Sequence, residues 1–334
     1  MKNYQTKNLR NVGIIGHSGS GKTTLTEAIL YYTKATDRFG RVEEGNTVSD
    51  YDPEEKKRKI SISASVAACE YDNTKINLVD MPGYFDFMGE TIQGLRAVDV
   101  AMIVVSSLSG IQVGTERSWD YVSDHKLPRA FYINKLDREN SDFDKVLASL
   151  KDQFGISVVP VQYPLGSESN FKGVINVISR RARVFNEKTH QMEEAEIPAE
   201  LIDKVDECKS MITEAVAETD EALLDKYFSE GTLSDEEIYN GLITGCSRGD
   251  IAPVMCGSAF LGIGTETLLE DIEECFPSPE KAQPIKVMDL KNQEEKDFTI
   301  SEDVPFSAFV FKTIADPFIG KLSLFRVMGG KVKA

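Results

Sequence analysis

GHSGSGKT, residues 16–23, matches the pattern G-x-x-x-x-G-K-[ST] at every fixed position. A short apolar run at residues 11–16 leads into it, and residues 23–33 follow with apolar side chains at helical spacing. A loop of this pattern binds phosphate when it follows a strand and opens a helix, and both neighbours are expected here. A chance glycine-rich turn would require neither of them. The octapeptide therefore predicts an α/β domain that binds a nucleotide.

The residue types in this loop suit phosphate chemistry. Gly16 and Gly21 let main-chain amides point inward at phosphate oxygens, and the N-terminus of the next helix adds positive potential. Lys22 is expected to reach the β- and γ-phosphates, while the hydroxyl of Thr23 holds Mg²⁺. We expect the following residues to bind the nucleotide: Gly16, His17, Ser18, Gly19, Ser20, Gly21, Lys22, Thr23 and Thr24.

Strand and helix patterns alternate after the loop. Such alternation is typical of parallel β-α-β units in a doubly wound sheet. Apolar runs predict strands at residues 75–80, 100–106 and 129–134, and helical spacing predicts helices near 88–97, 113–124 and 141–153.

The pattern changes after residue 155. Residues 156–250 combine hairpin-like strands with acidic helical segments, before a buried-strand pattern returns at 251–259 and a helix at 264–276. We therefore expect a nucleotide-binding domain over residues 1–280, into which a subdomain is inserted at about 156–250.

The last part of the sequence has a different character again. Prolines mark residues 277–287 as a linker. The alternating apolar residues that follow predict antiparallel β structure. Because the open edge of a few strands is hard to leave uncovered, we expect residues 281–334 to be the truncated beginning of a β-barrel domain.

NKLD, residues 134–137, follows one of the predicted strands and points to the base of the nucleotide. The carboxylate of Asp137 can accept two hydrogen bonds from the N1–H and exocyclic amine of guanine, whereas adenine offers no such pair. Lys135 can lay its aliphatic stem along the base, and Asn134 can tie the loops together. The small loop Ser258, Ala259 and Phe260 is expected to bring a main-chain amide to guanine O6.

DMPG, residues 80–83, follows another predicted strand and suits a loop that responds to the last phosphate. Asp80 is expected to hold Mg²⁺ through a water molecule, and the amide of Gly83 to bond the γ-phosphate. When that phosphate leaves, such a loop loses its anchor and moves. Residues 49–65 are the candidate for a second moving loop, in which Ser61 offers a hydroxyl to Mg²⁺.

The order of these motifs, GHSGSGKTT, RKISI, DMPGYFDF, NKLDR and CGSAF, resembles the translational GTPases, and most of all the elongation factor G type. The resemblance covers nearly the whole chain. It implies a P-loop GTPase fold with a mainly parallel, doubly wound sheet, an inserted α+β subdomain and part of a β-barrel. It also implies GTP or GDP with Mg²⁺ as cofactors. Since the rest of that barrel and three further domains are missing, we expect a piece of a longer protein.

The sequence departs from the family where hydrolysis is expected to occur. The family's D-T-P-G-H has Met81 in place of threonine and Tyr84 in place of the histidine that arranges the attacking water. In the phosphate loop, Ser18 replaces an apolar residue and Gly19 an aspartate, while Ser61 replaces a threonine that binds Mg²⁺. A phenol cannot present an imidazole to water or phosphate.

Three readings of the activity remain open. The first is a GTPase with a low intrinsic rate, in which Lys22, Gly83 and Tyr84 are the candidate catalytic residues. The second is a switch that binds GTP and GDP in two shapes with negligible turnover, because Tyr84 replaces the histidine. The third is an ATPase, which we consider the weakest because Asp137 has no good partner on adenine.

The charge of the chain limits its partners. The net charge is −16, and residues 187–240 alone hold 17 acids and 4 lysines, a net of −13. This argues against a general nucleic-acid binder and against DNA, although the remainder can present a basic face to RNA. The basic run at residues 56–59 is either such a contact or simply solvated charge.

The resemblance implies the ribosome as partner, through both rRNA and stalk proteins. Arg180, Arg181 and Arg183 are the candidate stalk contacts, with a solvated face as the alternative. No apolar run approaches the roughly 20 residues that span a bilayer, and the polar N-terminus lacks a signal core. We therefore expect a cytoplasmic monomer with reduced cysteines and no membrane partner.

Overall fold

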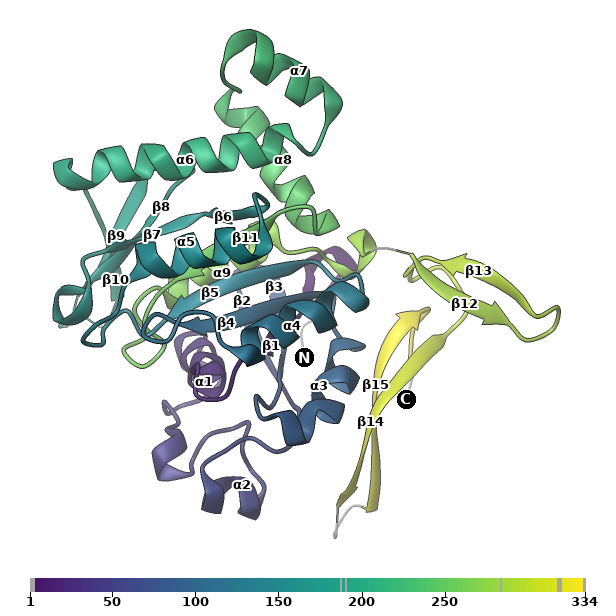
Figure 1. Cartoon of the computed structure of the whole chain (residues 1–334). Helices are drawn as coiled ribbons and strands as arrows, with labels where there is room; N and C mark the ends of the chain where they lie inside the picture. The colour runs from purple at the N-terminus through teal and green to yellow at the C-terminus, as the bar shows by residue number, and fades with distance from the viewer. Residues whose placement is uncertain (1–3, 187, 190, 283, 317–319, 333–334) are drawn as a thin grey trace.

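A seven-stranded, mainly parallel sheet is the centre of the described part of the chain (Figure 1). The computed structural model describes residues 4–332 except 187, 190, 283 and 317–319. The strand order is β2-β3-β1-β4-β5-β11-β6, and only β2 runs antiparallel to its neighbour among these described strands. The strands are β1 Leu9–Ile15, β2 Ser65–Tyr71, β3 Thr74–Asp80, β4 Val100–Ser106, β5 Arg129–Asn134, β6 Val158–Pro160 and β11 Ala252–Cys256. The predicted doubly wound α/β class is confirmed.

Helices cover the sheet, which is why its inner strands read as continuous apolar runs. Every residue of β4 is buried. Trp119 of α4 and Phe154 of α5 both stack on Phe131 of β5, so these two helices cover the same face. The helices around the sheet are α1 Lys22–Tyr32, α3 Met88–Leu95, α4 Val113–Asp124, α5 Phe143–Phe154 and α9 Thr265–Cys275.

The segment predicted as an insertion begins with a strand of the main sheet. β6 pairs in parallel with β11, so residues 158–160 belong to the central sheet. Beyond it lie an antiparallel sheet of order β10-β9-β8-β7 and a group of helices. These elements are β7 Gln162–Leu165, β8 Gly173–Asn176, β9 Arg181–Asn186, β10 Gln191–Ala195, α6 Ile202–Ala217, α7 Glu221–Glu230 and α8 Asp235–Arg248.

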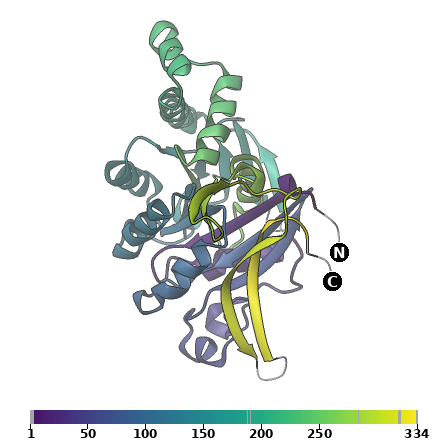
Figure 2. The ribbon, with the colours of Figure 1, turned by 90° about the vertical axis from the view of Figure 1, so that its right-hand side faces the viewer.

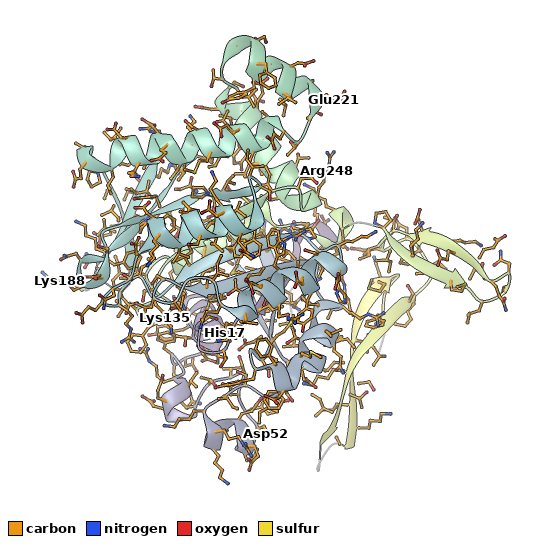
Figure 3. All side chains as sticks on the ribbon, viewed as in Figure 1. His17, Asp52, Lys135, Lys188, Glu221 and Arg248 are labelled. Atoms are coloured by element: carbon orange, nitrogen blue, oxygen red, sulfur yellow. The ribbon has the colours of Figure 1, made fainter. Side chains whose placement is uncertain are left out.

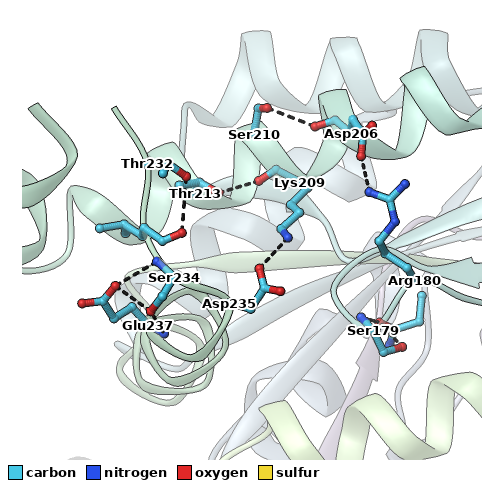
Figure 4. Close-up of polar contacts among 12 residues, drawn as sticks. Ser179, Arg180, Asp206, Lys209, Ser210, Thr213, Thr232, Ser234, Asp235 and Glu237 are labelled. Carbon is cyan, nitrogen blue, oxygen red and sulfur yellow. Dashed lines mark hydrogen bonds and ion pairs between the residues drawn. The ribbon is translucent and has the colours of Figure 1, made fainter. Parts of the chain in front are cut away.

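Capping residues and ion pairs fix the helices of this segment (Figure 4). Ser234 and Glu237 form a capping box at the start of α8, where their side chains satisfy amides that the helix leaves free. Lys209 of α6 donates to Asp235 of α8 at 2.6 Å, and Arg180 pairs with Asp206 of α6. The acidic side chains are thus partly neutralised within the segment.

Two hairpins form the C-terminal part of the described chain. β12 Ile285–Asp289 pairs with β13 Glu294–Phe298, and β14 Ser307–Asp316 pairs with β15 Gly320–Gly329. The linker predicted over residues 277–287 is therefore shorter, because β12 begins at Ile285. Figure 2, in which this side faces the viewer, shows β14 and β15 as a long two-stranded ribbon. Within the described residues, no helix is long and apolar enough to cross a membrane.

A nearly buried lysine joins the β14–β15 ribbon to the first domain. Lys312 of β14 donates to the main-chain oxygen of Ala64 and to Glu90 of α3, both at 2.7 Å. The same carboxylate oxygen of Glu90 accepts from the amide of Ala64 at 2.8 Å. The side chain of Lys312 is only 8% exposed, so its partners must replace water.

Replacing Lys312 with alanine is expected to loosen β14 from α3, because charged hydrogen bonds are lost and Glu90 stays without its cation. We expect the local opening free energy to fall by roughly 2 kcal/mol, or about 30-fold faster amide exchange. Hydrogen exchange of residues 307–316 measures it. Lys286, whose pair with Asp297 is largely exposed, is the matched control: Lys286→Ala should leave that exchange unchanged. Equal effects of the two variants would contradict this account.

Candidate nucleotide-binding site

A cavity of about 330 Å³ lies at the carboxyl edge of the sheet, where four loops that follow strands meet the segment between α1 and β2. The loops follow β1, β3, β5 and β11, and parallel strands of such sheets bind ligands at this edge. Figure 3 labels His17 and Lys135, which belong to two of these loops. The cavity is lined by Ser18, Gly19, Gly21, Lys22, Thr23, Thr24, Val42, Glu43, Asp50, Lys59, Ile60, Ser61, Gly83, Tyr84, Asn134, Lys135, Arg138 and Phe260.

Two glycines allow the loops to approach one another this closely. Gly21 has φ of 99°, and a Cβ there would collide with the side-chain nitrogen Nδ2 of Asn134. A Cβ on Gly83 would collide with the Lys22 ammonium and lie 2.7 Å from the amide of Ser18. The DMPG loop therefore packs directly on the phosphate loop, as a loop that senses a phosphate must.

Lys22 is the buried cation of the site. It begins helix α1, and its ammonium donates to the main-chain oxygens of Gly16 and His17 at 3.1 and 3.0 Å. Burial lowers the pKa of Lys22 to about 8, although Asp80 and Asp50 oppose that shift. A cation at a helix N-terminus makes this end of the cavity attractive to phosphate.

Hydroxyls and carboxylates gather beside Lys22. The Thr23 and Ser61 hydroxyl oxygens lie 3.1 Å apart, although they come from the phosphate loop and from the 49–65 segment. Burial, followed by the charge of Asp50, raises the pKa of Asp80 to about 7. The hydroxyl of Ser61 beside Asp50, and those of Thr23 and Ser49 beside Asp80, favour the charged forms of the two carboxylates and so oppose these upward pKa shifts.

These oxygens fit a hard divalent cation. Mg²⁺ is commonly held by one or two carboxylates together with the phosphates of a substrate. In the described part of the chain, no group of three or more His, Cys, Asp or Glu side chains could hold a metal ion. The buried carboxylates of Asp50 and Asp80 and the two hydroxyls therefore suit a cation that arrives with phosphate.

Asp50 is a site residue that the sequence patterns did not reveal. It lies in the 49–65 segment, is buried and lines the cavity, and burial raises its pKa. No motif surrounds it, so nothing in the sequence separates it from the neighbouring Asp52, which instead caps α2 Pro53–Arg58. The basic run at 56–59 begins in that short, exposed helix.

Asn134 connects the loops at the other end of the cavity. Its side-chain nitrogen Nδ2 donates to the main-chain oxygen of Ser20 at 3.0 Å. Its carbonyl oxygen accepts from the amides of Lys135 and Ala259, at 2.8 and 3.0 Å. One buried side chain thereby holds the phosphate loop, the NKLD loop and the SAF loop in register.

Asp137, the last residue of the NKLD loop, contacts the SAF loop. It accepts a hydrogen bond from the Ser258 hydroxyl at 2.6 Å and pairs with Arg138 at 3.3 Å. Lys135 reaches across the cavity and donates to the main-chain oxygen of Gly19 at 2.6 Å. This set holds a carboxylate and a lysine stem in positions that suit a planar base.

His17 and Tyr84 differ in their relation to the cavity. The ring nitrogen Nδ1 of His17 lies 3.3 Å from the amide of Gly114 at α4, and burial followed by Lys22 lowers its pKa. The imidazole thus packs against α4, and its ring centroid is 6.4 Å from that of Phe85. Tyr84 lines the cavity and keeps 43% of its surface exposed.

Comparison with known proteins shows the family of the chain. Residues 7–278 match the family described as the Elongation factor Tu GTP binding domain. The chain therefore belongs to the translational GTPases. It is also similar to a protein from Thermus thermophilus of known crystal structure, with 36% sequence identity and a TM-score of 0.85. That match covers 98% of this chain but 46% of the other, so the chain spans less than half of that protein's length.

Replacing Asn134 with alanine is expected to disconnect the three loops, because the amide of Ala259 and the carbonyl of Ser20 lose a partner. Leaving such buried groups unpaired should lower the free energy of unfolding by about 2 to 3 kcal/mol. Urea denaturation without nucleotide measures it. Asn77, which bonds the side chain of Asn11 away from the cavity, is the control. Asn77→Ala should cost about 1 kcal/mol, and a reversed order would contradict the role given to Asn134.

Proposed function

We propose that this chain is the nucleotide-binding part of a GTPase of the elongation factor G type. It binds GTP with Mg²⁺ and hydrolyses GTP in connection with a ribosomal step of translation. One observation supports the proposal: a single cavity is lined by the buried Lys22 and Asp50 at one end and by Asn134, Lys135 and Arg138 at the other, where the Asp137–Ser258 pair adjoins them. The first end suits a metal-bound triphosphate and the second suits guanine.

Guanine selection is assigned to Asp137. Its carboxylate is held in place by the Ser258 hydroxyl, so it can accept from two donors on one edge of guanine without first becoming ordered. Adenine has no such pair of donors on that edge, so its binding would leave the carboxylate of Asp137 without hydrogen-bond partners. A site of this kind discriminates strongly between the two bases. The amide of Ala259 is already bonded to Asn134, so contact of the SAF loop with guanine O6 stays a prediction.

Wild-type protein should prefer GDP over ADP by roughly 10³-fold or more, and Asp137→Ala should remove most of that preference. Competition of unlabelled nucleotides against fluorescent GDP, with magnesium present, measures it. Glu139, an exposed carboxylate two residues away, provides the control, since Glu139→Ala should change neither affinity nor preference. Wild-type protein that bound both nucleotides equally would refute the proposed function as a whole.

Metal binding is assigned to Thr23 and Ser61 directly and to Asp80 through water, with Asp50 as a further carboxylate beside them. The cation would neutralise the charge that builds up between the β- and γ-phosphates. Lys22 stabilises charge on the same oxygens, and the amide of Gly83 offers a hydrogen bond to the γ-phosphate. Lys22, Gly83 and Tyr84 are thus the candidate catalytic residues, and positioning and electrostatics supply the rate.

Tyr84 also supports a second candidate function. It is half exposed at the edge of the cavity, where the family has the histidine that arranges water. A phenol there leaves the attacking water without its usual partner. The alternative is therefore a switch whose GTP- and GDP-bound shapes are read by partners, with negligible turnover.

Replacing Tyr84 with histidine is expected to raise the hydrolysis rate by up to about 10²-fold, as restoring one preorganised group near the reacting phosphate can do. Single-turnover hydrolysis of bound GTP, with and without ribosomes, measures it. Lys22→Ala sets the background. Wild-type rates equal to that background in both conditions would favour the switch, and an unchanged Tyr84→His rate would overturn our account of this position.

The ribosome, through rRNA and stalk proteins, is the proposed partner, in the cytoplasm and as a monomer. Two of the arginines considered for stalk contact already have ion-pair partners: Arg183 pairs with Glu270 and Glu266, and Arg180 pairs with Asp206. This makes Arg180 and Arg183 weaker candidates than the exposed Arg181. We also propose the domain division: residues 1–280 with a subdomain inserted at about 156–250, followed by the start of a barrel at 281–334.

A further inference from the structure

An arginine from the loop between α1 and α2 rests on a phenylalanine of the SAF loop. The guanidinium of Arg41 lies 4.1 Å from the ring centroid of Phe260, and its Nη1 donates to the main-chain oxygen of Phe260 at 3.2 Å. Phe260 lines the nucleotide cavity, as do Val42 and Glu43, which follow Arg41 in sequence. The contact thus joins two walls of the cavity.

The contact is part of a longer row of aromatic and cationic side chains. Arg41 also lies 4.4 Å from the ring of Phe39, which stacks on Tyr31 of α1 at 5.7 Å. On the other side, Arg138 lies 4.9 Å from the ring of Phe260. Two guanidinium groups thus lie over the ring of Phe260, and each is attracted to the negative face of an aromatic ring.

The base of the loop is fixed, so that Arg41 is presented to Phe260. Glu27 of α1 accepts from the amides of Gly40 and Val48 at 3.1 and 2.6 Å. The amide of Arg41 itself donates to Asn46 at 2.6 Å. The side chain of Arg41 accordingly forms its contact with Phe260 from a backbone that is already ordered.

We propose that Arg41 is a positioning residue that acts through Phe260 to slow the release of the bound nucleotide. A nucleotide leaving between the two walls must separate the loop that carries Arg41 from the SAF loop, and so must break the guanidinium–ring contact and the bond to the Phe260 oxygen. Arg138 connects this contact to base recognition, because it also pairs with Asp137. The proposal rests on the proposed function, since it concerns the same cavity.

The test is the dissociation rate of a fluorescent GDP analogue from the purified chain with magnesium, followed by stopped flow. Arg41→Ala should speed dissociation about 10-fold, because the contact that must open for release is lost. Arg58 is the matched control: it lies in the same connecting segment but pairs with Glu54. Arg58→Ala should dissociate GDP at the wild-type rate.

Substitutions of Phe260 distinguish an aromatic contact from simple apolar packing. Phe260→Tyr keeps a ring face and should retain slow release, whereas Phe260→Leu keeps apolar bulk but no ring and should release GDP faster than wild type. The double variant should be slower than the product of the two single effects, since both remove the shared guanidinium–ring contact. If Arg41→Ala proves unstable, Arg41→Lys serves instead, with partial acceleration expected because lysine lacks the planar group.

Two results would overturn this role: unchanged release in Arg41→Ala, or effects of Arg41→Ala and Phe260→Leu that multiply as if independent. Neither would touch guanine binding itself, which the competition with ADP tests separately. Absence of GDP binding to the wild-type chain would instead refute the proposed function and, with it, this inference.

Discussion

The side-chain amide of Asn134 satisfies polar groups from three loops that no regular element connects. Each loop leaves the sheet at a different strand, and without a shared partner their main-chain groups would be buried unpaired. The side chain of Asn134 forms hydrogen bonds with Ser20, Lys135 and Ala259 at the same time. The phosphate loop and the two loops expected to bind the base are therefore held in fixed positions relative to one another. This side chain therefore fixes the distance between the two ends of the cavity.

At the phosphate end the dominant constraint is charge. Lys22, Asp50 and Asp80 are all buried, and burial disfavours the charged form of each. The attraction of Lys22 for the two carboxylates offsets part of that cost, whereas the two carboxylates repel each other. Under the proposed function, a triphosphate with a divalent cation would add both signs of charge to the same small volume, and binding would relieve groups that the protein alone leaves poorly solvated.

How far the sequence predicts the structure depends on whether a signal is local. The strands 100–106 and 129–134 and the helix 113–124 have the predicted bounds, because an apolar run marks each strand and helical spacing marks the helix. β6 is only three residues long, and its place in the main sheet is set by pairing with β11, almost a hundred residues away. Asp50 and the Arg41–Phe260 contact depend in the same way on distant loops meeting, which no pattern within either loop records.

Lys312 bonds at the same time to Ala64, at the end of one loop that faces the nucleotide, and to Glu90, in the helix that follows the other. A single ammonium group cannot keep both bonds if either partner is displaced. The β14–β15 ribbon is consequently bonded to both loops through one side chain, in addition to the pair that Arg326 of β15 forms with Asp99. Displacing either loop would therefore remove part of the attachment of the ribbon to the first domain.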